Sequence, residues 1–563
     1  MTDNANDAGD ENGATGKKRG RAKDDGAMAV VISSKPAEFI IAPKQSAGAP
    51  AVQMFADGGA NIIDQLRTYS GLDIRVVRTL RPANLFAAGA TGGASAVLVE
   101  MDQDKGRQLQ AQVASRSSAI WVEANERMEL MHGFGHIWRT GPQYSGLFDA
   151  ANAVTIDINV MGDGGRPLAG ATVTLHGLGF PMNARTDANG MAQISTPQSS
   201  LNAITAIVID PASMHWSKVV RNPNLQAGRV NAIRVQSFKE FDADYGNGAT
   251  SWGVKRLGAA AQRDLTGRGV KVGVIDTGCD ITHPALTHVK GGGDFNPNAG
   301  ADTWKIDENG HGTHCAGVVG ANAGSVRGMA PEADLYIYKV FPDATFFTLD
   351  AAMETAISNG VDILSMSLGS DVPSDVLTDQ FERAREAGVL CIVAAGNTGD
   401  GVKFPAHLSS AVAVSAMGST LAIPIDSISA QTFNPAFFTP DGDFSPRFTC
   451  FGNEIDFVAP GVGVIAPVPN GGYRAMDGTS MATPHVAGLA ALALAHDPAL
   501  QRAPKNAARV DMLVERLRAM CSPLPWGAAR AGAGLPTLGV APLMHAAMFA
   551  TPFPLEGWIA ARH

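Results

Sequence analysis

The feature that most constrains the fold of this chain is a regular alternation, over residues 241–545, of short apolar runs with longer amphipathic stretches. The apolar runs lie at residues 270–275, 335–340, 363–367, 389–394 and 411–416, and helix-like stretches lie between them at residues 314–320, 348–359 and 374–387. Runs that are apolar on both faces predict buried parallel strands. Their alternation with helices predicts a doubly wound α/β domain with a mostly parallel sheet, whose functional groups gather at the carboxyl ends of the strands.

Three glycine-rich polar segments of this region carry an acid, an imidazole and a hydroxyl. Asp276 follows the first apolar run in DTGCD, His311 lies in NGHGTHCAG, and Ser480 lies in DGTSMATPHVAG. A serine hydroxyl is a poor nucleophile until an imidazole can take its proton. The imidazole in turn needs a carboxylate, which fixes its tautomer and stabilises its cation. The three residues therefore predict nucleophilic catalysis by Ser480.

Taken together, the motifs DTG, HGTHCAG and GTSMATPHVAG resemble the three catalytic blocks of the subtilisin-like serine protease family (subtilases, peptidase S8). They occur in the family's order and at intervals that are ordinary for it, and the resemblance covers about residues 252–540. It implies that Asp276 is the orienting carboxylate, His311 the general base and then acid, and Ser480 the nucleophile that forms the acyl-enzyme. The implied activity is that of a serine endopeptidase acting on polypeptide substrates.

The same resemblance implies residues for transition-state and substrate binding. Asn397, in VAAGNTG, matches the family's oxyanion-hole asparagine, which acts together with the backbone N–H of Ser480. The walls of the S1 pocket, which pair with extended substrate, match Ser367, Leu368 and Gly369 on one side and Ala394, Ala395 and Gly396 on the other. Glycine and alanine walls predict a roomy, uncharged pocket that prefers apolar or aromatic P1 residues.

Residues 29–131 show a β-α-β-β-α-β succession, which predicts a ferredoxin-like α+β unit. The unit resembles the inhibitor I9-type prodomain of subtilases, which assists folding and then inhibits the enzyme as part of the same chain. This resemblance implies a precursor that cleaves itself between Met131 and His132, with Met131 at P1 and Met128 at P4.

The rest of the chain divides by composition. Residues 1–28 are polar and predict a disordered tail, residues 132–150 a linker, and residues 546–563 a C-terminal tail. Residues 151–238 contain short alternating runs separated by Gly, Pro, Asn and Asp turns, which predicts a small all-β sandwich. A docking role and a purely structural role are both open for this module.

Composition excludes several classes of function. The chain has 44 basic and 53 acidic residues, a formal net charge of −9, which argues against nucleic-acid binding. Its longest apolar run, residues 486–495, falls well short of the ~18 residues of a membrane span. The first residues lack the apolar core of a Sec signal peptide, which favours a cytoplasmic location and leaves export by another route open. Five scattered cysteines without a C-x-x-C pair predict reduced thiols.

No cofactor is needed for the chemistry expected at Ser480. Calcium is common in the family, but the segment after His311 has no carboxylate before Glu332, so no metal ligand is assigned and a structural calcium ion elsewhere stays open. The main alternative function is a catalytically inactive subtilisin-like scaffold or binding protein. A pepsin-like aspartic protease built on Asp276 is a remote alternative, because such enzymes need two DTG loops or a dimer and this chain has one.

Overall fold

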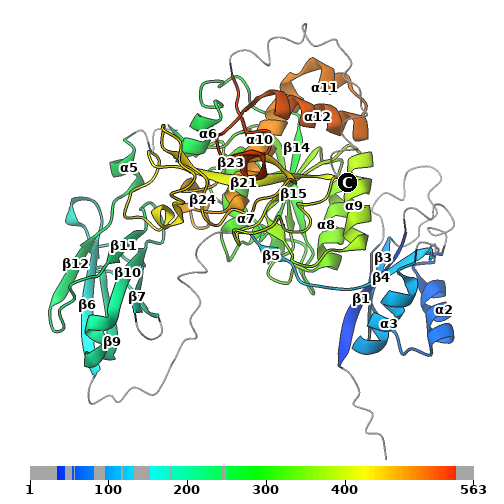
Figure 1. Cartoon of the computed structure of the whole chain (residues 1–563), viewed down its shortest axis with the longest axis horizontal. Coiled ribbons are helices and arrows are strands. Elements are labelled where there is room, and N and C mark those ends of the chain that lie inside the picture. The colour runs from blue at the N-terminus through cyan, green and yellow to red at the C-terminus, as the bar shows by residue number, and fades with distance from the viewer. Residues whose placement is uncertain are drawn as a thin grey trace, which may run out of the picture.

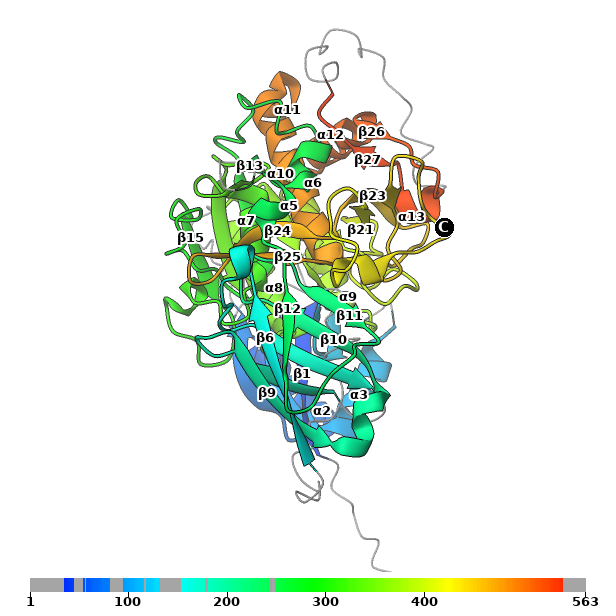
Figure 2. The ribbon, with the colours of Figure 1, turned by 90° about the vertical axis from the view of Figure 1, so that its left-hand side faces the viewer.

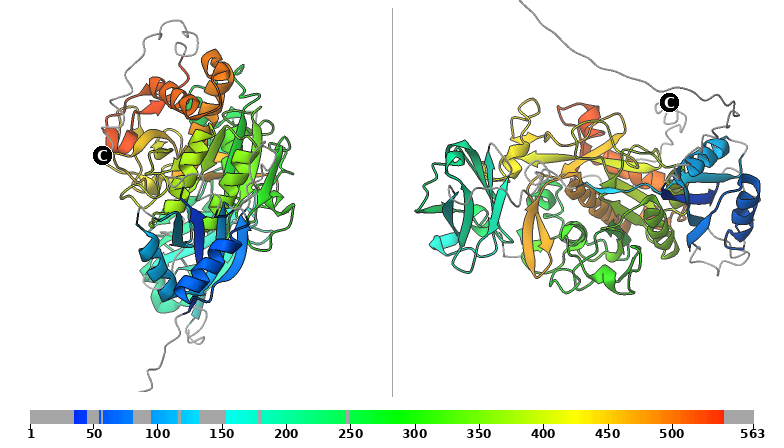
Figure 3. Two further views of the ribbon diagram at one scale, coloured as in Figure 1. Left: turned by 90° about the vertical axis from the view of Figure 1, so that its right-hand side faces the viewer. Right: turned by 90° about the horizontal axis from the view of Figure 1, so that it is seen from below.

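The computed structural model describes residues 35–44, 54–55, 57–80, 95–115, 118–131, 153–177, 181–243, 245 and 249–539. The segments expected as tails and linker, at residues 1–28, 132–150 and 546–563, lie outside the described residues, and so does His132. The described chain forms three bodies. A central α/β body lies between an α+β unit of residues 36–130 and a β module of residues 153–234, which flank it on opposite sides (Figure 1, Figure 3).

The central body is built on an eight-stranded sheet in the order β15-β17-β14-β18-β20-β21-β22, with β23 also paired to β21. All of these pairs are parallel except β21 with β22. The strands are β14 (Lys271–Asp276), β15 (Gly291–Asp294), β17 (Asp334–Lys339), β18 (Ile363–Met366), β20 (Leu390–Ala394), β21 (Ala411–Ser419), β22 (Asp443–Phe444) and β23 (Ile455–Pro460). The doubly wound, mostly parallel α/β class predicted from the sequence is thereby confirmed.

Helices cover both faces of this sheet, which is why its strands are apolar throughout. On one face lie α7 (His311–Gly320) and α10 (Thr479–His496), and on the other α8 (Phe346–Ser358) and α9 (Asp375–Glu386). The strands alternate between two cores accordingly: in β20, Leu390 and Ile392 pack with α10, and Cys391 and Val393 pack with α8 and α9. Two further helices, α11 (Pro498–Arg502) and α12 (Ala507–Ala519), lie against α10.

The α+β unit is a four-stranded antiparallel sheet in the order β2-β3-β1-β4 with two helices. Its elements follow one another as β1 (Pro36–Pro43), α2 (Ala60–Ser70), β2 (Arg75–Leu80), β3 (Ala96–Asp102), α3 (Gln103–Val113) and β4 (Ile120–Ala124). One face of the sheet, with Phe39 and Val99, packs under α2 and α3. The opposite face, with Ile40 and Leu98, joins the core that contains α8 and α9. This sheet is therefore buried between its own helices and the central body.

The β module consists of two sheets, in the orders β11-β10-β7-β8 and β12-β6-β9. Its strands are β6 (Ala153–Met161), β7 (Thr172–Gly177), β8 (Met182–Arg185), β9 (Met191–Pro197), β10 (Ile204–Asp210), β11 (Lys218–Arg221) and β12 (Val230–Arg234). Inward-facing residues of both sheets, such as Ile158, Val173 and Ile207, form one separate core. Figure 2 looks onto this module, with the central body above it and the α+β unit behind.

Residues 421–448 of the central body hold the β module in place. The backbone N–H of Val219 donates to the carbonyl of Asp426 at 2.7 Å, and the Lys218 ammonium contacts the Asp426 carboxylate at 2.6 Å. A second ion pair joins Arg474 to Asp210 at 2.7 Å. Trp216, only 2% exposed, packs in the main core of the central body. The module is thus docked by both polar and apolar contacts.

The remaining elements are short connections and hairpins. They are β5 (Glu129–Leu130), α5 (Phe238–Phe241), β13 (Ala249–Thr250), α6 (Trp252–Arg256), β16 (Val326–Arg327), β19 (Leu368–Gly369), β24 (Val464–Val468), β25 (Gly472–Met476), β26 (Cys521–Ser522), α13 (Ala528–Ala531) and β27 (Leu535–Pro536). Within the described part of the chain, every helix is too short or too polar to span a bilayer.

Candidate active site

Asp276 and His311 meet at the carboxyl edge of the central sheet. Asp276 is the last residue of β14, which is paired on both sides with β17 and β18 and is therefore held rigidly. His311 is the first residue of α7. The Nδ1 atom of His311 lies 2.7 Å from Oδ1 of Asp276, and both side chains are buried. The carboxylate therefore fixes the imidazole so that its other nitrogen, Nε2, is the one able to take up a proton.

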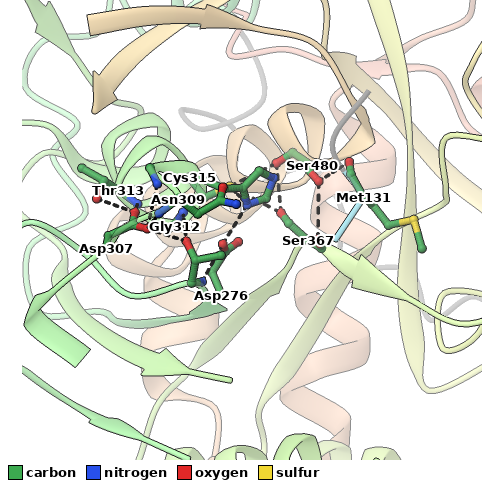
Figure 4. Close-up of polar contacts among 12 residues, drawn as sticks. Met131, Asp276, Asp307, Asn309, Gly312, Thr313, Cys315, Ser367 and Ser480 are labelled. Carbon is green, nitrogen blue, oxygen red and sulfur yellow. Dashed lines mark hydrogen bonds and ion pairs between the residues drawn. The ribbon is translucent and has the colours of Figure 1, made fainter. Parts of the chain in front are cut away.

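Asp307, which the sequence analysis did not single out, joins the two elements that carry this pair (Figure 4). Its Oδ1 accepts hydrogen bonds from Thr277 Oγ1 and from the backbone N–H of Gly310, both at 2.8 Å. Its Oδ2 accepts from the backbone N–H of Thr313 at 2.8 Å and from the hydroxyl of Thr313 at 2.7 Å. The carboxylate thus binds the residue after Asp276 and the first turn of α7 at once.

The same network explains why α7 begins at His311 and not at residue 314, where the sequence predicted its start. Gly310 has a positive φ of 87°, a conformation that favours glycine and lets the chain turn into the helix. A Cβ atom on Gly312 would lie 2.2 Å from the carbonyl oxygen of Gly278, so the close approach of α7 to the DTG loop also requires glycine. The glycines around His311 therefore serve the local geometry that positions its ring.

Ser480 is the second residue of α10 and is fully buried. The thiol of Cys315 contacts both Ser480 and His311. Its Sγ is 3.5 Å from the carbonyl oxygen of Ser480 and 3.8 Å from Nδ1 of His311. Burial raises the pKa of Cys315, so this thiol stays protonated and is not the nucleophile. The structure thus brings Asp276, His311 and Ser480 together from three distant segments.

The electrostatic setting of His311 differs from that of two other buried histidines. Burial alone lowers the pKa of His311, but the facing Asp276 carboxylate acts in the opposite direction, and the pKa lies well above its usual value. Burial lowers the pKa of His314 to about 3 and that of His485 to about 4. His314 and His485 are therefore neutral, whereas the Asp276 carboxylate stabilises a proton that His311 takes up.

Asn397 lies directly after β20 and presents a hydrogen-bond donor next to Ser480. Its Oδ1 accepts from the backbone N–H and the hydroxyl of Thr479, both at 2.9 Å. Its Nδ2 is buried and has no hydrogen-bond partner among the described residues. A buried amide donor is costly to leave unpaired, so this N–H is suited to a developing negative oxygen.

The end of the α+β unit occupies the site as an extended peptide. Strand β5 pairs antiparallel with β19, with Leu130 opposite Leu368 and Glu129 opposite Gly369. The backbone N–H of Met131 donates to the carbonyl of Ser367 at 3.0 Å. The carbonyl of Met131 accepts from the backbone N–H of Ser480 at 3.2 Å and also from the Ser480 hydroxyl (Figure 4). The carbonyl oxygen of Met131 is therefore held at Ser480 by two hydrogen bonds.

The S1 pocket agrees with the prediction at Gly369, and it differs on the opposite side, where a residue outside the predicted set is present. The tip of Met131, its Cε, lies 2.5 Å from the position that a Cβ on Gly369 would take, so this wall must be glycine. On the opposite side, Gly396 and Ala395 contact Lys403, whose ammonium forms ion pairs. The structure therefore adds Lys403 to the border of the pocket, because the loop that follows Asn397 returns to Ala395. The expected preference for apolar or aromatic P1 residues stays a prediction.

The α+β unit is also anchored away from the site, at the first turn of α9. The Glu123 carboxylate accepts hydrogen bonds from the backbone N–H of Asp375 at 3.0 Å and from the hydroxyl of Ser374. The Nε1 of Trp121 donates to Oδ2 of Asp379 at 2.8 Å. Burial raises the pKa of Glu123 to about 7 despite these hydrogen bonds.

The side chains of Asp276, His311 and Cys315 are close enough to hold a metal ion, since their ligand atoms lie within 4.8 Å of one another. Their chemistry does not favour one. Nδ1 of His311 is already bonded to Asp276, and the raised pKa of Cys315 keeps the thiol protonated, whereas a metal needs the thiolate.

Comparison with known proteins identifies the family to which the central body is similar. The subtilase family model matches residues 267–516. The chain is 38% identical to M-protease of Shouchella clausii (strain KSM-K16) over 282 residues, which are 48% of this chain and 67% of that protein. It is 38% identical to Subtilisin Savinase of Lederbergia lenta over 255 residues, 44% of this chain and 85% of that protein. It is 37% identical to Subtilisin E of Bacillus subtilis (strain 168) over 260 residues, 44% of this chain and 61% of that protein. With these matches and the geometry above, the chain belongs to the subtilase family of serine endopeptidases.

Proposed function

We propose that this chain is an endopeptidase that acts through Asp276, His311 and Ser480 and that is made as a precursor inhibited by its own α+β unit. The observation that carries the proposal is the position of Met131, whose carbonyl accepts hydrogen bonds from both the backbone N–H and the hydroxyl of Ser480. A peptide carbonyl held in this way is placed for attack by the serine oxygen.

The proposed reaction begins with proton transfer from Ser480 to Nε2 of His311, while Asp276 stabilises the imidazolium through Nδ1. The serine oxygen adds to the carbonyl carbon of Met131, and the negative oxygen that forms is stabilised by the backbone N–H of Ser480 and by Nδ2 of Asn397. His311 then gives its proton to the nitrogen of His132 as the peptide bond breaks. A water molecule, deprotonated by the same imidazole, releases the acyl group and regenerates the serine. These steps call for no cofactor.

Inhibition follows from the same contacts. Residues 128–131 fill the cleft as the acyl side of a substrate, with the Met128 N–H donating to the Ala344 carbonyl at 2.9 Å and the Met131 N–H to Ser367. Met128 and Met131 are both buried, which fits apolar P4 and P1 residues. As long as the α+β unit stays docked, another polypeptide cannot pair with β19. The unit is thus proposed as an inhibitor I9-like prodomain.

A fluorophosphonate probe tests the proposed chemistry, because it reacts with an activated serine and not with an inert one. Purified wild-type protein should be labelled at Ser480, and Ser480→Ala should not be labelled. His311→Ala should also lose labelling, since the hydroxyl then has no base. Absence of labelling in wild-type protein freed of residues 35–131 would support the alternative of an inactive scaffold and contradict the proposal.

A further inference from the structure

Lys403 belongs to the loop between Asn397 and the next strand, and it lies where the two expected walls of the S1 pocket approach each other. Its backbone N–H donates to the carbonyl of Ala395, on one wall, at 2.9 Å. The next residue, Phe404, is bridged to Ser370, which follows the other wall: the Ser370 N–H donates to Phe404 at 2.8 Å and the Phe404 N–H to Ser370 at 3.1 Å. The backbone at Lys403 is therefore fixed between the two walls.

The side chain of Lys403 fills the space where the walls meet. A Cβ on Gly396 would lie 2.6 Å from Cγ of Lys403, and a Cβ on Gly369 would lie 3.3 Å from Cβ of Lys403. The same Cβ position on Gly369 lies 2.5 Å from Cε of Met131. The methylene stem of Lys403 and the tip of Met131 thus both lie next to Gly369. The lysine side chain is 13% exposed, so most of its stem is buried in this position.

Two surface carboxylates hold the ammonium group of Lys403. Nζ lies 2.7 Å from Oδ1 of Asp371 and 3.2 Å from Oδ1 of Asp400. The side chains of Asp371 and Asp400 are 79% and 60% exposed, so the ammonium is held toward solvent while the stem stays inside. These two contacts favour this position of the lysine, because movement of the stem would separate a positive charge from both partners.

We propose that Lys403 determines the P1 specificity of the proposed protease by closing the S1 pocket at the length of an aliphatic side chain. Methionine and leucine fit the space between Gly369 and the lysine stem, and the rings of phenylalanine and tyrosine do not. This inference rests on the proposed function and narrows it, because the sequence predicted a roomy pocket open to aromatic residues. Filled space excludes a larger group strongly, since a well-packed site cannot relax without loss of contacts.

The test uses the processed wild-type enzyme and peptide p-nitroanilides of the form succinyl-Met-Glu-Leu-X, which repeat residues 128–130 before a variable P1 residue. The ratio of kcat/KM for X = Phe to that for X = Met should be below roughly 0.1 in the wild type. In Lys403→Ala the ratio should rise roughly tenfold or more, because the missing stem opens the pocket. Lys403→Met keeps an unbranched stem without charge and should keep the wild-type ratio, whatever its absolute rate.

Lys505→Ala is the matched control for loss of a lysine. Lys505 pairs with Asp362 at 3.0 Å, just before β18 begins and therefore at the opposite edge of the sheet, so its removal should leave the profile unchanged. A wild-type enzyme that cleaves after Phe as fast as after Met would overturn the proposal without any variant. An unchanged ratio in labelled Lys403→Ala would also overturn it. Loss of fluorophosphonate labelling in the wild type would instead overturn the proposed function on which it rests.

Discussion

At the scale of single residues, the position of the His311 ring depends on contacts that Asp307 makes with both sides of the site. Its two carboxylate oxygens bind Thr277, next to Asp276, and Gly310 and Thr313, on either side of His311. Asp276 and His311 are therefore positioned by one buried carboxylate that contacts neither of their side chains. Asp307 is a positioning residue, and its removal should affect turnover more than substrate binding.

We expect Asp307→Asn to lower kcat by roughly ten- to a hundredfold with little change in KM. One carboxylate oxygen becomes an NH₂ group facing hydrogen-bond donors, so the loop shifts, and a shift of about 1 Å in a catalytic group can cost about a hundredfold. Steady-state kinetics on a peptide p-nitroanilide measures the effect. Asp302→Asn is the control, because the Asp302 side chain is 77% exposed and forms an ion pair with Lys305 at the surface. A rise in KM with unchanged kcat would contradict this role.

The sequence predicted those site residues whose chemistry is local, and it missed those whose role is tertiary. Asp276, His311 and Ser480 stand in motifs whose residue types indicate nucleophilic catalysis, and Asn397 was found through the resemblance to subtilases. Lys403 resembles any surface lysine in the sequence, because only the return of the loop to Ala395 and Ser370 places it in the pocket. Asp307 had a weaker signal, an acid four residues before His311 in DENGHGTH.

At the scale of elements, the docking of β4 onto the first turn of α9 couples the α+β unit to pH. Glu123 accepts hydrogen bonds there from Ser374 and from the backbone N–H groups of Asp375 and Val376, which favour its ionised form. Burial acts against ionisation more strongly, and Asp375 adds to it, so the pKa rises from 4.5 to about 7. Asp350, buried near Glu123, Glu354 and Arg383, also has its pKa raised to about 7, mainly by burial.

A raised pKa in the docked state means that docking is fully favoured below the free pKa of 4.5 and weakens as the pH rises through about 7. The shift corresponds to roughly 3 kcal/mol for Glu123 at most. In Ser480→Ala, hydrogen–deuterium exchange of β4 and β5, corrected for intrinsic rates, should therefore be faster at pH 8 than at pH 6. Adding Glu123→Gln should reduce this difference, because the side chain can no longer ionise. Equal protection of the two variants at both pH values would refute the coupling.

Element bounds were predictable to within a few residues where hydrophobic pattern alone determines them. β14, β17 and β20 begin and end within a residue or so of the predicted apolar runs, because strands buried on both faces carry a continuous apolar signal. β21 continues beyond its predicted end to Ser419, where it pairs with β22 from the segment after residue 421. That extension depends on a partner far along the chain, which periodicity does not reveal.

At the scale of the whole molecule, the β module and the α+β unit lie on opposite sides of the central body (Figure 3). The module follows the α+β unit in the sequence, yet it does not cover the cleft that β5 occupies. Its contacts run instead to residues 421–448 and to Arg474. We therefore expect the module to stay attached after residues 35–131 leave. The sequence indicated two extra modules, but their placement depends on surface contacts that no motif encodes.

Trp216 should be the main apolar anchor of the module. Its ring is 2% exposed and packs edge-on against Phe238 and Phe241 at 5.3 and 5.5 Å. Trp216→Ala should weaken docking by roughly 3–5 kcal/mol, as for other buried tryptophans. Exchange protection should then fall in residues 421–448 and in β11, and stay unchanged in the separate core of the module at Ile158. Trp526→Ala, a buried tryptophan in the C-terminal part of the central body, is the control and should not alter β11. Unchanged protection in Trp216→Ala would show that hydrogen bonds and ion pairs hold the module without this ring.

The most direct test of the central claim is intact-protein mass spectrometry of the wild type beside Ser480→Ala, produced and purified identically. The account predicts that the wild type separates into one piece ending at Met131 and another beginning at His132, whereas Ser480→Ala keeps this bond intact. Cleavage of the same bond in Ser480→Ala, or an uncut wild type that the fluorophosphonate probe nevertheless labels, would contradict the claim that the Met131 carbonyl is held at Ser480 for the chain's own proteolysis.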